Sequence, residues 1–559
     1  MAHKVKWILI LALVIEAHAF SQAPLLAFPG AEGFGRFAKG GRGGRVIRPT
    51  TAALFKAACQ DSSGKRIVIA QNGGTFDFNS LGGLITVSKR NLTVPDQCVP
   101  GSGNLLKNVT FKIIAPEVIL QNVRVAMGDD IIAGVRSDAR DCIQMGAGEA
   151  YPDSVWNIII DHGSTVWGID ENVAAGDGGG RLSITNTIIA YALSRSIHPE
   201  IEHSKGLLWH MTGGDSVSFI RNLLAHNLDR NARMVGAGRA EFNDNYVYNY
   251  QATTAIGGGA ASPASLEFRR NYFKPGADTP ANKYILTTGG GSMTGQLVYA
   301  EGNRGYNRLT DTGDDWLVTA LPSVNQSTQP LMGKTGTDWD ADTVAGNLLL
   351  NQVGPWPRSA IDSAAIASVK EIGAVGRVIN GVTARKINFP YGTILHWGRG
   401  PTADSVKISI TGIGSSSNRY QALNYVVDSG PGAGQARVVD LSSIQNNDIG
   451  SGGPGCFLIF NTQFGTPLVA GSSVGHVEQD IVVPVSPVGW PTMTAGTPLT
   501  DTDSDGLPDV WEVYFGGTTT SITQSAVFTS DGRTYMDHYM HHCLTLRMAG
   551  LPIEPRYLM

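Results

Sequence analysis

The sequence predicts an all-β protein built mainly as a parallel β-helix, a solenoid of stacked coils, with a smaller β domain and a short acidic tail behind it. Short apolar runs recur between residues 105 and 305, each ending at or near an Asn. No helical pattern separates the runs, which argues against alternating β and α units. Glycine makes up 69 of 559 residues and charged residues only 16%, a composition typical of strands and tight turns.

The repeat supports the solenoid directly. Its runs are spaced by about 23 to about 40 residues, the range for one coil with variable loops. Because equivalent turns stack on adjacent coils, an Asn at a repeated turn can hydrogen-bond the next coil. The runs lie at 118–122, 158–162, 182–186, 217–222, 241–245, 266–271 and 297–303.

The N-terminus has the pattern of a secretory signal. Lys4 and Lys6 precede an apolar run at 7–15, and Ala17-His-Ala19 offers a cleavage site between small residues. This run is too short to span a bilayer, and no later segment has the required length. We therefore expect a secreted protein, extracellular or periplasmic, with no membrane span.

Five cysteines, at 59, 98, 142, 456 and 543, could form disulfides in an exported chain. The odd number leaves at least one unpaired, and Cys59 with Cys98 is one plausible pair. None of the spacings suits a zinc site.

Changes in pattern suggest five parts. Residues 360–372 have helical spacing, and alternating β segments with Gly-rich turns begin near residue 396. The expected parts are a signal peptide at 1–19, the β-helix at 24–310, a helical or irregular segment packing on it at 311–395, an accessory β domain at 396–488 and the acidic tail at 489–559.

The tail contains an acidic loop at residues 501–512. In an EF-hand-type loop, the first, third, fifth, ninth and twelfth positions supply oxygens to Ca²⁺, and a glycine at the sixth makes the turn. A solvated acidic linker is the alternative, but chance rarely fills all six positions. We expect a structural Ca²⁺ held by Asp501, Asp503, Asp505, Asp509 and Glu512, with Gly506 at the turn.

A second group of acids lies in the predicted β-helix. Residues on adjacent coils lie about 4.8 Å apart, so their carboxylates can converge on one Ca²⁺, which prefers hard oxygen ligands. A single Asp of this kind more often caps a turn, and we give Asp161, beside His162, that structural role. The expected metal ligands are Asp141, Asp170 and Glu171.

Basic residues follow the acids, on the next predicted coils. Exposed solubilising charge is the alternative for Lys205, Arg230 and Arg233, but arginine suits bidentate binding of carboxylates. A groove with a cation and these side chains would hold a polymer that bears one carboxylate per unit. Such a site favours removal of the proton α to that carboxylate, followed by β-elimination. By intrinsic pKa alone, arginine is the least plausible general base.

Together these segments resemble the pectate lyases of polysaccharide lyase family 1, over about residues 27–305. The resemblance rests on the glycine-rich stretch from Ala27, the Asp161-His162 coil, His203-Ser-Lys205 and Asp229-Arg-Asn-Ala-Arg233. It implies a right-handed parallel β-helix and Ca²⁺-dependent β-elimination of polygalacturonate, with an arginine as base. It further implies that Arg230 is catalytic, that Lys205 binds substrate and that Asp141 is the first calcium aspartate.

The sequence departs from that family at three positions. Trp167 stands where the first acid of an Asp-Gly-x-x-Asp segment is usual, which leaves Asp170 and Glu171 as ligands. Ala232 replaces a proline two residues after the catalytic arginine. Val235 occupies the place of a second substrate arginine, so Arg233 is expected to serve instead.

Two other functions stay open. A β-helical hydrolase of the polygalacturonase kind needs close carboxylates, such as Asp129 and Asp130, but no Gly-His-Gly or Arg-Ile-Lys segment follows them. A non-catalytic polysaccharide-binding solenoid is the other, and Trp167 is its best support. The net charge of −4 argues against nucleic acid but is compatible with an acidic polysaccharide. We expect a monomer.

Overall fold

The fold was taken from a computed structural model, in which the side chains of residues 24–382 and 485–557 are described with short gaps. Between 385 and 481 only the backbone of five strands is described, so the expected signal peptide and Cys456 lie outside the described residues. No helix among the described residues is long and apolar enough to cross a membrane. The gaps are 131, 147–154, 177–178, 195, 199–202, 212–215, 237, 257–263, 290–292, 311, 340–346, 372–375 and 383–384.

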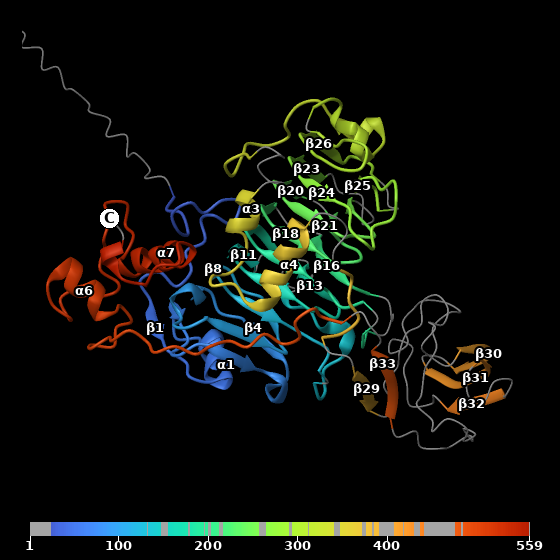
Figure 1. Ribbon diagram of the computed structural model, residues 1–559, viewed down its shortest axis with the longest axis horizontal. Coiled ribbons are helices and arrows are strands. Elements are labelled where there is room, and N and C mark those ends of the chain that lie inside the picture. The colour runs from blue at the N-terminus through green and yellow to red at the C-terminus, as the bar shows by residue number, and fades with distance from the viewer. Residues whose placement is uncertain are drawn as a thin grey trace, which may run out of the picture.

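Three parallel sheets form the body of the protein, with 11, nine and eight strands. From β5 onward, neighbouring strands in a sheet are usually three apart in sequence, so each coil contributes one strand to each sheet. Figure 1 shows the strands succeeding one another in sequence order, from blue through green. This arrangement is a parallel β-helix and confirms the predicted fold class.

The strands of the eleven-stranded sheet are β1 (Arg45–Ile47), β2 (Arg66–Val68), β5 (Leu92–Pro95), β8 (Val118–Gln121), β11 (Val155–Asp161), β14 (Gly179–Thr185), β17 (Ser216–Ile220), β20 (Gly238–Asn243), β23 (Ala264–Arg269), β26 (Leu297–Glu301) and β28 (Gln326–Ser327). Those of the nine-stranded sheet are β4 (Leu84–Val87), β7 (Thr110–Ile113), β10 (Ile143–Met145), β13 (Glu171–Ala175), β16 (Lys205–Met211), β19 (Arg233–Gly236), β22 (Thr254–Ile256), β25 (Leu286–Thr287) and β27 (Thr319–Ala320). Those of the eight-stranded sheet are β3 (Gly74–Asp77), β6 (Asn104–Lys107), β9 (Arg124–Ala126), β12 (Ser164–Val166), β15 (Ile188–Ala190), β18 (Leu223–Ala225), β21 (Tyr246–Tyr248) and β24 (Tyr272–Lys274).

Apolar side chains stack in register through the interior. Ile160 lies opposite Ile184, and Ile184 opposite Phe219. The same row continues to Phe242 and Phe268, whose rings stack at a centroid distance of 5.6 Å. Because each coil places a similar residue at the same position, the short strands bury their inward side chains in one continuous core.

A ladder of buried asparagines holds one corner of the coils. The backbone N–H of Asn222 donates to Asn245 Oδ1 at 2.9 Å, that of Asn245 to Asn271 Oδ1 at 2.9 Å, and that of Asn271 to Asn303 Oδ1 at 3.0 Å. The sequence repeat therefore correctly predicted that these four asparagines hydrogen-bond the neighbouring coil at a turn. Asn122 and Asn186 do not join the ladder, because they occupy the preceding, left-handed position, with φ of 62° and 49°.

Replacing Asn245 by alanine is expected to lower the free energy of unfolding by about 3 kcal/mol. Its side chain also donates to Phe219 O and Asn271 Oδ1, and accepts from Asn222 Nδ2, so the change leaves several buried groups without partners. Denaturant unfolding would measure the loss. Asn307→Ala, on an exposed turn, should change the stability by less than about 0.5 kcal/mol, and equal losses in both variants would contradict the ladder's role.

Helices and long loops cover the sheets. The helix α1 (Ala52–Gln60) lies against β2 and β4 near the first coils, and α3 (Asn347–Gln352) and α4 (Ala360–Lys370) follow the last coil in sequence. Within the 311–395 segment, α4 packs on the eight-stranded sheet, where Asp362 accepts a 2.5 Å hydrogen bond from Ser164 Oγ. Strands β27 and β28 extend the parallel sheets to residue 327, beyond the expected boundary at 310.

His226 joins α4 to the sheet. Its Nδ1 accepts from Asn249 Nδ2 at 2.9 Å and its Nε2 contacts Ser368 Oγ at 2.8 Å, while the ring stacks on Tyr191. Since Ser368 Oγ itself donates to Ala365 O, His226 fits as a neutral ring that donates through Nε2. Burial lowers the pKa of His226 to about 4.

We expect the stability of the protein to fall as the pH drops from about 6.5 toward 4. Below its ordinary pKa, His226 takes up a proton in the unfolded chain but not in the fold, at a cost of about 2 kcal/mol by pH 5. In His226→Gln, the free energy of unfolding should depend less steeply on pH over this range. Denaturant titrations at several pH values would measure both slopes, and equal slopes would contradict the neutral, buried ring.

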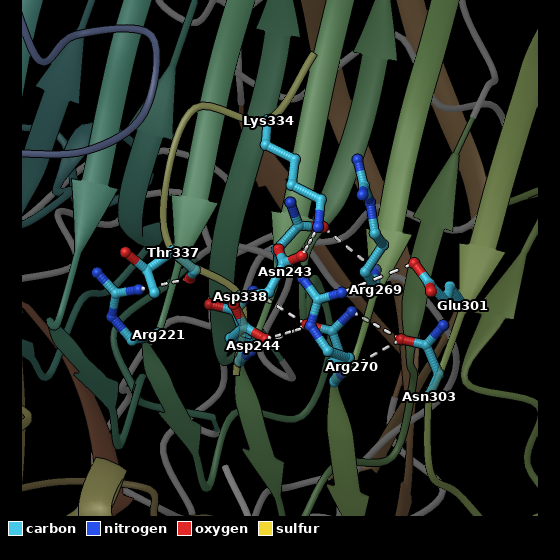
Figure 2. Close-up of polar contacts among 12 residues, drawn as sticks. Arg221, Asn243, Asp244, Arg269, Arg270, Glu301, Asn303, Lys334, Thr337 and Asp338 are labelled. Atoms are coloured by element: carbon cyan, nitrogen blue, oxygen red, sulfur yellow. Dashed lines mark hydrogen bonds and ion pairs between the residues drawn. The ribbon is translucent and has the colours of Figure 1, made fainter. Parts of the chain in front are cut away.

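A strap, residues 331–338, crosses the eleven-stranded sheet. Buried Glu267 accepts from the backbone N–H groups of Leu331 and Met332, at 2.5 and 3.0 Å. Figure 2 shows Asp338 beside Arg270 and Lys334, and it pairs with both. Arg270 in turn contacts Asp244 at 3.0 Å. These charges fix the strap over the strands.

The segment between the β-helix and the tail forms two small sheets. Strands β29 (Arg385–Pro390) and β33 (His476–Ile481) pair antiparallel, as do β30 (Lys407–Ser416), β31 (Arg419–Ser429) and β32 (Ala436–Asp440). The tail contributes α6 (Asp509–Gly516) and α7 (Tyr535–Met548), which lie near β1 in Figure 1. The suggested Cys59–Cys98 pair was wrong, because the cysteine that lies beside Cys98 is Cys543.

Candidate active site

Four charged residues occupy one row at the start of consecutive strands in the nine-stranded sheet. In the register of this sheet, Ile143 pairs with Val173 and Glu171 with Lys205, and Lys205 forms a bridge to Asp229. Asp141 and Glu171 each lie two residues before Ile143 and Val173, so the same register places Asp141 beside Glu171. Adjacent strands lie about 4.8 Å apart, so these side chains are close neighbours.

The three predicted metal ligands of the β-helix converge. Carboxylate oxygens of Asp141, Asp170 and Glu171 all lie within 4.8 Å of one another. Asp141 Oδ1 also accepts from the backbone N–H of Glu171 at 2.9 Å, which fixes its orientation. Asp141 and Glu171 are buried, and Asp170 is about a quarter exposed at its side chain (24%). Such an all-oxygen set is the chemistry that Ca²⁺ prefers.

The electrostatics of the three acids also fit a cation. Burial, and then repulsion by Asp170, raises the pKa of Asp141 well above its ordinary value. Burial would raise the pKa of Asp170 too, but its hydrogen bond with His203 and the charge on that ring hold it below the ordinary value. A divalent ion would offset the repulsion between these two carboxylates.

Arg230 lies directly against this cluster. It sits on the coil after Lys205, at a left-handed φ of 57°, and its Nη1 forms an ion pair with Glu171 Oε1. Its Nε is buried and has no hydrogen-bond partner among the described residues. Burial lowers the pKa of Arg230, against the opposing effect of Asp170. The guanidinium is thus partly desolvated beside the acids.

Lys205 and Arg233 flank Asp229. Lys205 Nζ donates to Asp229 Oδ2 at 2.8 Å, with 14% of the lysine side chain exposed. Burial alone would raise the pKa of Asp229, but Lys205, and to a lesser degree Arg233, keep it low. Arg233 begins β19 and is half-buried. The predicted basic residues therefore gather beside the acids.

Sequence reasoning missed three residues of the site. His203 Nε2 contacts Asp170 Oδ1 at 2.8 Å, and His198 stacks on His203 with the ring centroids 3.6 Å apart. Lys112, on β7, contributes positive charge next to Asp141. His203 was visible within the His-Ser-Lys motif, but its contact with Asp170 depends on the loop between strands.

Trp167 lies in the core instead of the site. It is fully buried, and its ring meets Trp490 edge to face at a centroid distance of 4.9 Å. Lys107 Nζ in turn lies 4.4 Å from the Trp490 ring centroid. Trp167 therefore makes an apolar contact with the start of the tail.

Other acids have structural contacts. Asp161 Oδ2 contacts His162 Nδ1 at 2.8 Å and its Oδ1 accepts from Thr185 and Asn186, as expected for a turn residue. Asp129 is fully buried and accepts from the backbone of the segment around Val382. Asp130 pairs with Lys107 at 3.3 Å. Asp129 and Asp130 are thus engaged in packing the fold, which disfavours the acid–base pair of a hydrolase.

In the tail, Asp501, Asp503 and Asp505 also bring their oxygens within 4.8 Å of one another. Glu512 is fully buried, and its Oε2 has no hydrogen-bond partner among the described residues. Burial and the charge of Asp503 raise the pKa of Glu512 to about 7. Asp509 instead accepts two 2.7 Å hydrogen bonds from Thr502. Three of the five predicted ligands thus converge, Glu512 is close enough to Asp503 to be affected by its charge, and the hydrogen bonds of Asp509 stabilise the loop.

The sequence is related to known proteins over about two thirds of its length. It is 30% identical over 384 residues to a probable pectate lyase C of Aspergillus fumigatus, an alignment that covers 66% of this chain and 83% of that protein. The chain belongs to the pectate lyase family. A probable pectate lyase C of Emericella nidulans is also 30% identical over 384 residues, with 65% and 83% covered. No family model matches the chain.

Among solved structures, the pectate lyase of Bacillus sp. N165 in complex with trigalacturonate has 16% sequence identity and a TM-score of 0.40, over 58% of this chain and 99% of that one. About a third of the present chain lies outside its alignment with the Aspergillus fumigatus relative.

Proposed function

We propose that this protein is a secreted lyase that cleaves pectate, or a related polyuronate, by calcium-assisted β-elimination. The observation that carries the proposal is the contact between a cluster of three carboxylates and Arg230, one coil away from Lys205. The names of its relatives, probable pectate lyase C, support the substrate class.

The basic residues would bind the substrate. A polyuronate carries a carboxylate on every unit, and arginine binds carboxylates through two parallel hydrogen bonds. Arg233 and Lys205 lie beside Asp229 and are partly exposed, so each can exchange part of that contact for a substrate carboxylate. Before a cation and the polymer bind, the negative charges of the nearby acids balance the positive charges of these basic residues.

Asp141, Asp170 and Glu171 would hold the Ca²⁺. When bound, the ion withdraws electrons from the uronate carboxylate and so acidifies the proton at C5. Arg230, its pKa lowered by burial, takes that proton in its neutral form. The C5–H electron pair becomes the C4–C5 double bond, the C4–O bond breaks, and the leaving oxygen gains a proton from water.

The proposal can be tested by digesting polygalacturonate in water enriched in the heavy oxygen isotope. Elimination adds no water across the broken bond, so mass spectrometry should find unsaturated fragments without the label. One labelled oxygen per cleavage would instead indicate a hydrolase. Calcium-dependent binding without any cleavage would favour the non-catalytic solenoid.

We also propose that the tail loop binds a structural Ca²⁺ through Asp501, Asp503, Asp505 and Glu512. The buried, unpartnered oxygens of Asp501 and Glu512 support it, because such groups are costly without a cation. The loop lies against the first strand: Arg48 Nη2 donates to Gly506 O at 2.9 Å, and a side chain at Gly506 would collide with Val46.

Replacing Asp501 and Asp505 together by asparagine should abolish calcium binding at the loop and lower the Tm measured in calcium. Titration calorimetry should then show one binding site fewer, while cleavage of polygalacturonate is retained, because the loop lies far from Arg230 in sequence and on a different part of the fold. Glu554→Gln, which alters an acid paired with Arg556 near the C-terminus, serves as the control. Unchanged calorimetry in the double variant would refute the loop site.

A further inference from the structure

Helix α7 of the tail is fastened to the first part of the β-helix around a short 3₁₀ turn, η2 (Asp96–Cys98). Gln97 Nε2 donates to Met540 O at 3.2 Å, and Arg547 Nε donates to Gln97 O at 2.5 Å. Arg547 Nη1 also reaches Gly101 O at 3.1 Å. These contacts attach α7 to the β-helix at Gln97 and Gly101, on either side of Cys98 in the sequence.

That residue is Cys98, and it faces Cys543. Cys543 lies three residues after Met540 and four before Arg547, on the helix face that meets η2. Both cysteines are buried, with exposures of 4% and 0%, and burial and then the neighbouring Cys543 side chain raise the pKa of Cys98. The hydrogen bonds on either side of the pair hold the two segments that carry the cysteines against each other.

We propose that Cys98 and Cys543 form a disulfide in the exported protein. Cys59 and Cys142 are also buried, and none of the groups that shift the pKa of either is a cysteine. The inference does not rest on the proposed lyase activity; it rests on this pair and on the expected export into an oxidising compartment.

The reaction is thiol–disulfide exchange with a protein dithiol oxidase in its disulfide form. The Sγ–Sγ bond between Cys98 and Cys543 forms, the S–S bond of the oxidase breaks, and both thiol protons end on its two sulfurs. Burial raises the pKa of Cys98 in the folded chain, which makes its thiol unreactive there. The exchange therefore takes place before α7 has docked fully.

The bond would tie the C-terminal helix to an early coil and enclose the whole candidate active site between the linked residues. The tail would then stay attached even when the calcium loop is empty. Chelation alone should leave α7 in place, and reduction combined with chelation should release it.

The test uses the wild-type chain secreted into the periplasm or medium, unfolded without reductant and treated with an alkylating reagent. Mass spectrometry of a non-reducing digest should find the peptides containing Cys98 and Cys543 joined and lighter by two hydrogen atoms, with Cys59 and Cys142 alkylated. In Cys98→Ser, Cys543 should become alkylated, and Cys59→Ser should leave the joined peptides unchanged.

Alkylation of both Cys98 and Cys543 in the secreted wild type would overturn the proposal, as would a link from either to Cys456. Because this measurement needs only the wild-type chain, it stands even if a variant fails to fold. As an independent readout, reductant should lower the Tm of the wild type and leave that of the Cys98→Ser/Cys543→Ser double variant unchanged.

Discussion

Replacing Arg230 by alanine is expected to lower kcat on polygalacturonate by about 10²- to 10⁴-fold, the contribution of one positioned proton-transfer group. Arg230 contacts the carboxylate cluster directly, through Glu171. Its guanidinium is mostly buried, which brings its pKa closer to that of a usable base. The measurement is the initial rate at saturating substrate and calcium.

Two arginine variants separate catalysis from general charge effects. Arg233→Ala, three residues further along at the start of β19, should raise KM with a smaller change in kcat, because Arg233 is expected to bind substrate. Arg239→Ala removes an exposed arginine on the eleven-stranded sheet, beside Ser216, and should leave both constants unchanged. A kcat for Arg230→Ala within a few-fold of wild type, in a variant with unchanged Tm, would remove Arg230 from the chemistry.

Removing calcium is expected to abolish activity, and Asp170→Asn should raise the calcium concentration needed for half-maximal rate by at least about 10-fold. Asp170 supplies one of the three converging carboxylates and is the most exposed of them. The asparagine keeps the side-chain volume but loses the charge that a cation requires. Initial rates across a calcium titration, after exhaustive chelation, would measure the shift.

Asp138→Asn is the matched control. Asp138 lies three residues before Asp141, but its carboxylate pairs with exposed Arg136 and it does not belong to the cluster of Asp141, Asp170 and Glu171. The calcium concentration that gives half-maximal rate should be the same in Asp138→Asn as in the wild type. Full activity in Asp170→Asn at the wild-type calcium concentration would show that the ion, if bound, does not use this carboxylate.

The β-helix could be predicted because its physical cause is local and repeated. Each coil needs an apolar strand and a turn residue that can hydrogen-bond its neighbour, and the ladder from Asn222 to Asn303 meets that need. The register was harder to predict. Asn122 lies in the left-handed position one residue before the ladder, and its side chain bonds Trp356 instead, a contact across more than 200 residues.

The candidate site could be predicted in part for the same reason. Asp141, Glu171 and Lys205 recur at the starts of consecutive strands, and parallel register converts that recurrence into proximity. The contacts that come from loops and distant segments could not be predicted. His198 reaches His203 from an insertion, and Trp490 covers Trp167 from the far end of the chain. Neither partner has any periodic relation to the residue it contacts.

We expect this fold to cleave a polyuronate by elimination, with Arg230 as the base. The most direct test is the near-ultraviolet absorbance of polygalacturonate incubated with wild-type protein and with Arg230→Ala, each with Ca²⁺ and with excess chelator. Absorbance that rises only with wild type and Ca²⁺ is the predicted result, because the C4–C5 double bond is conjugated to the carboxylate. New reducing ends without absorbance would show hydrolysis, and an equal rise with Arg230→Ala would show that Arg230 is not the base.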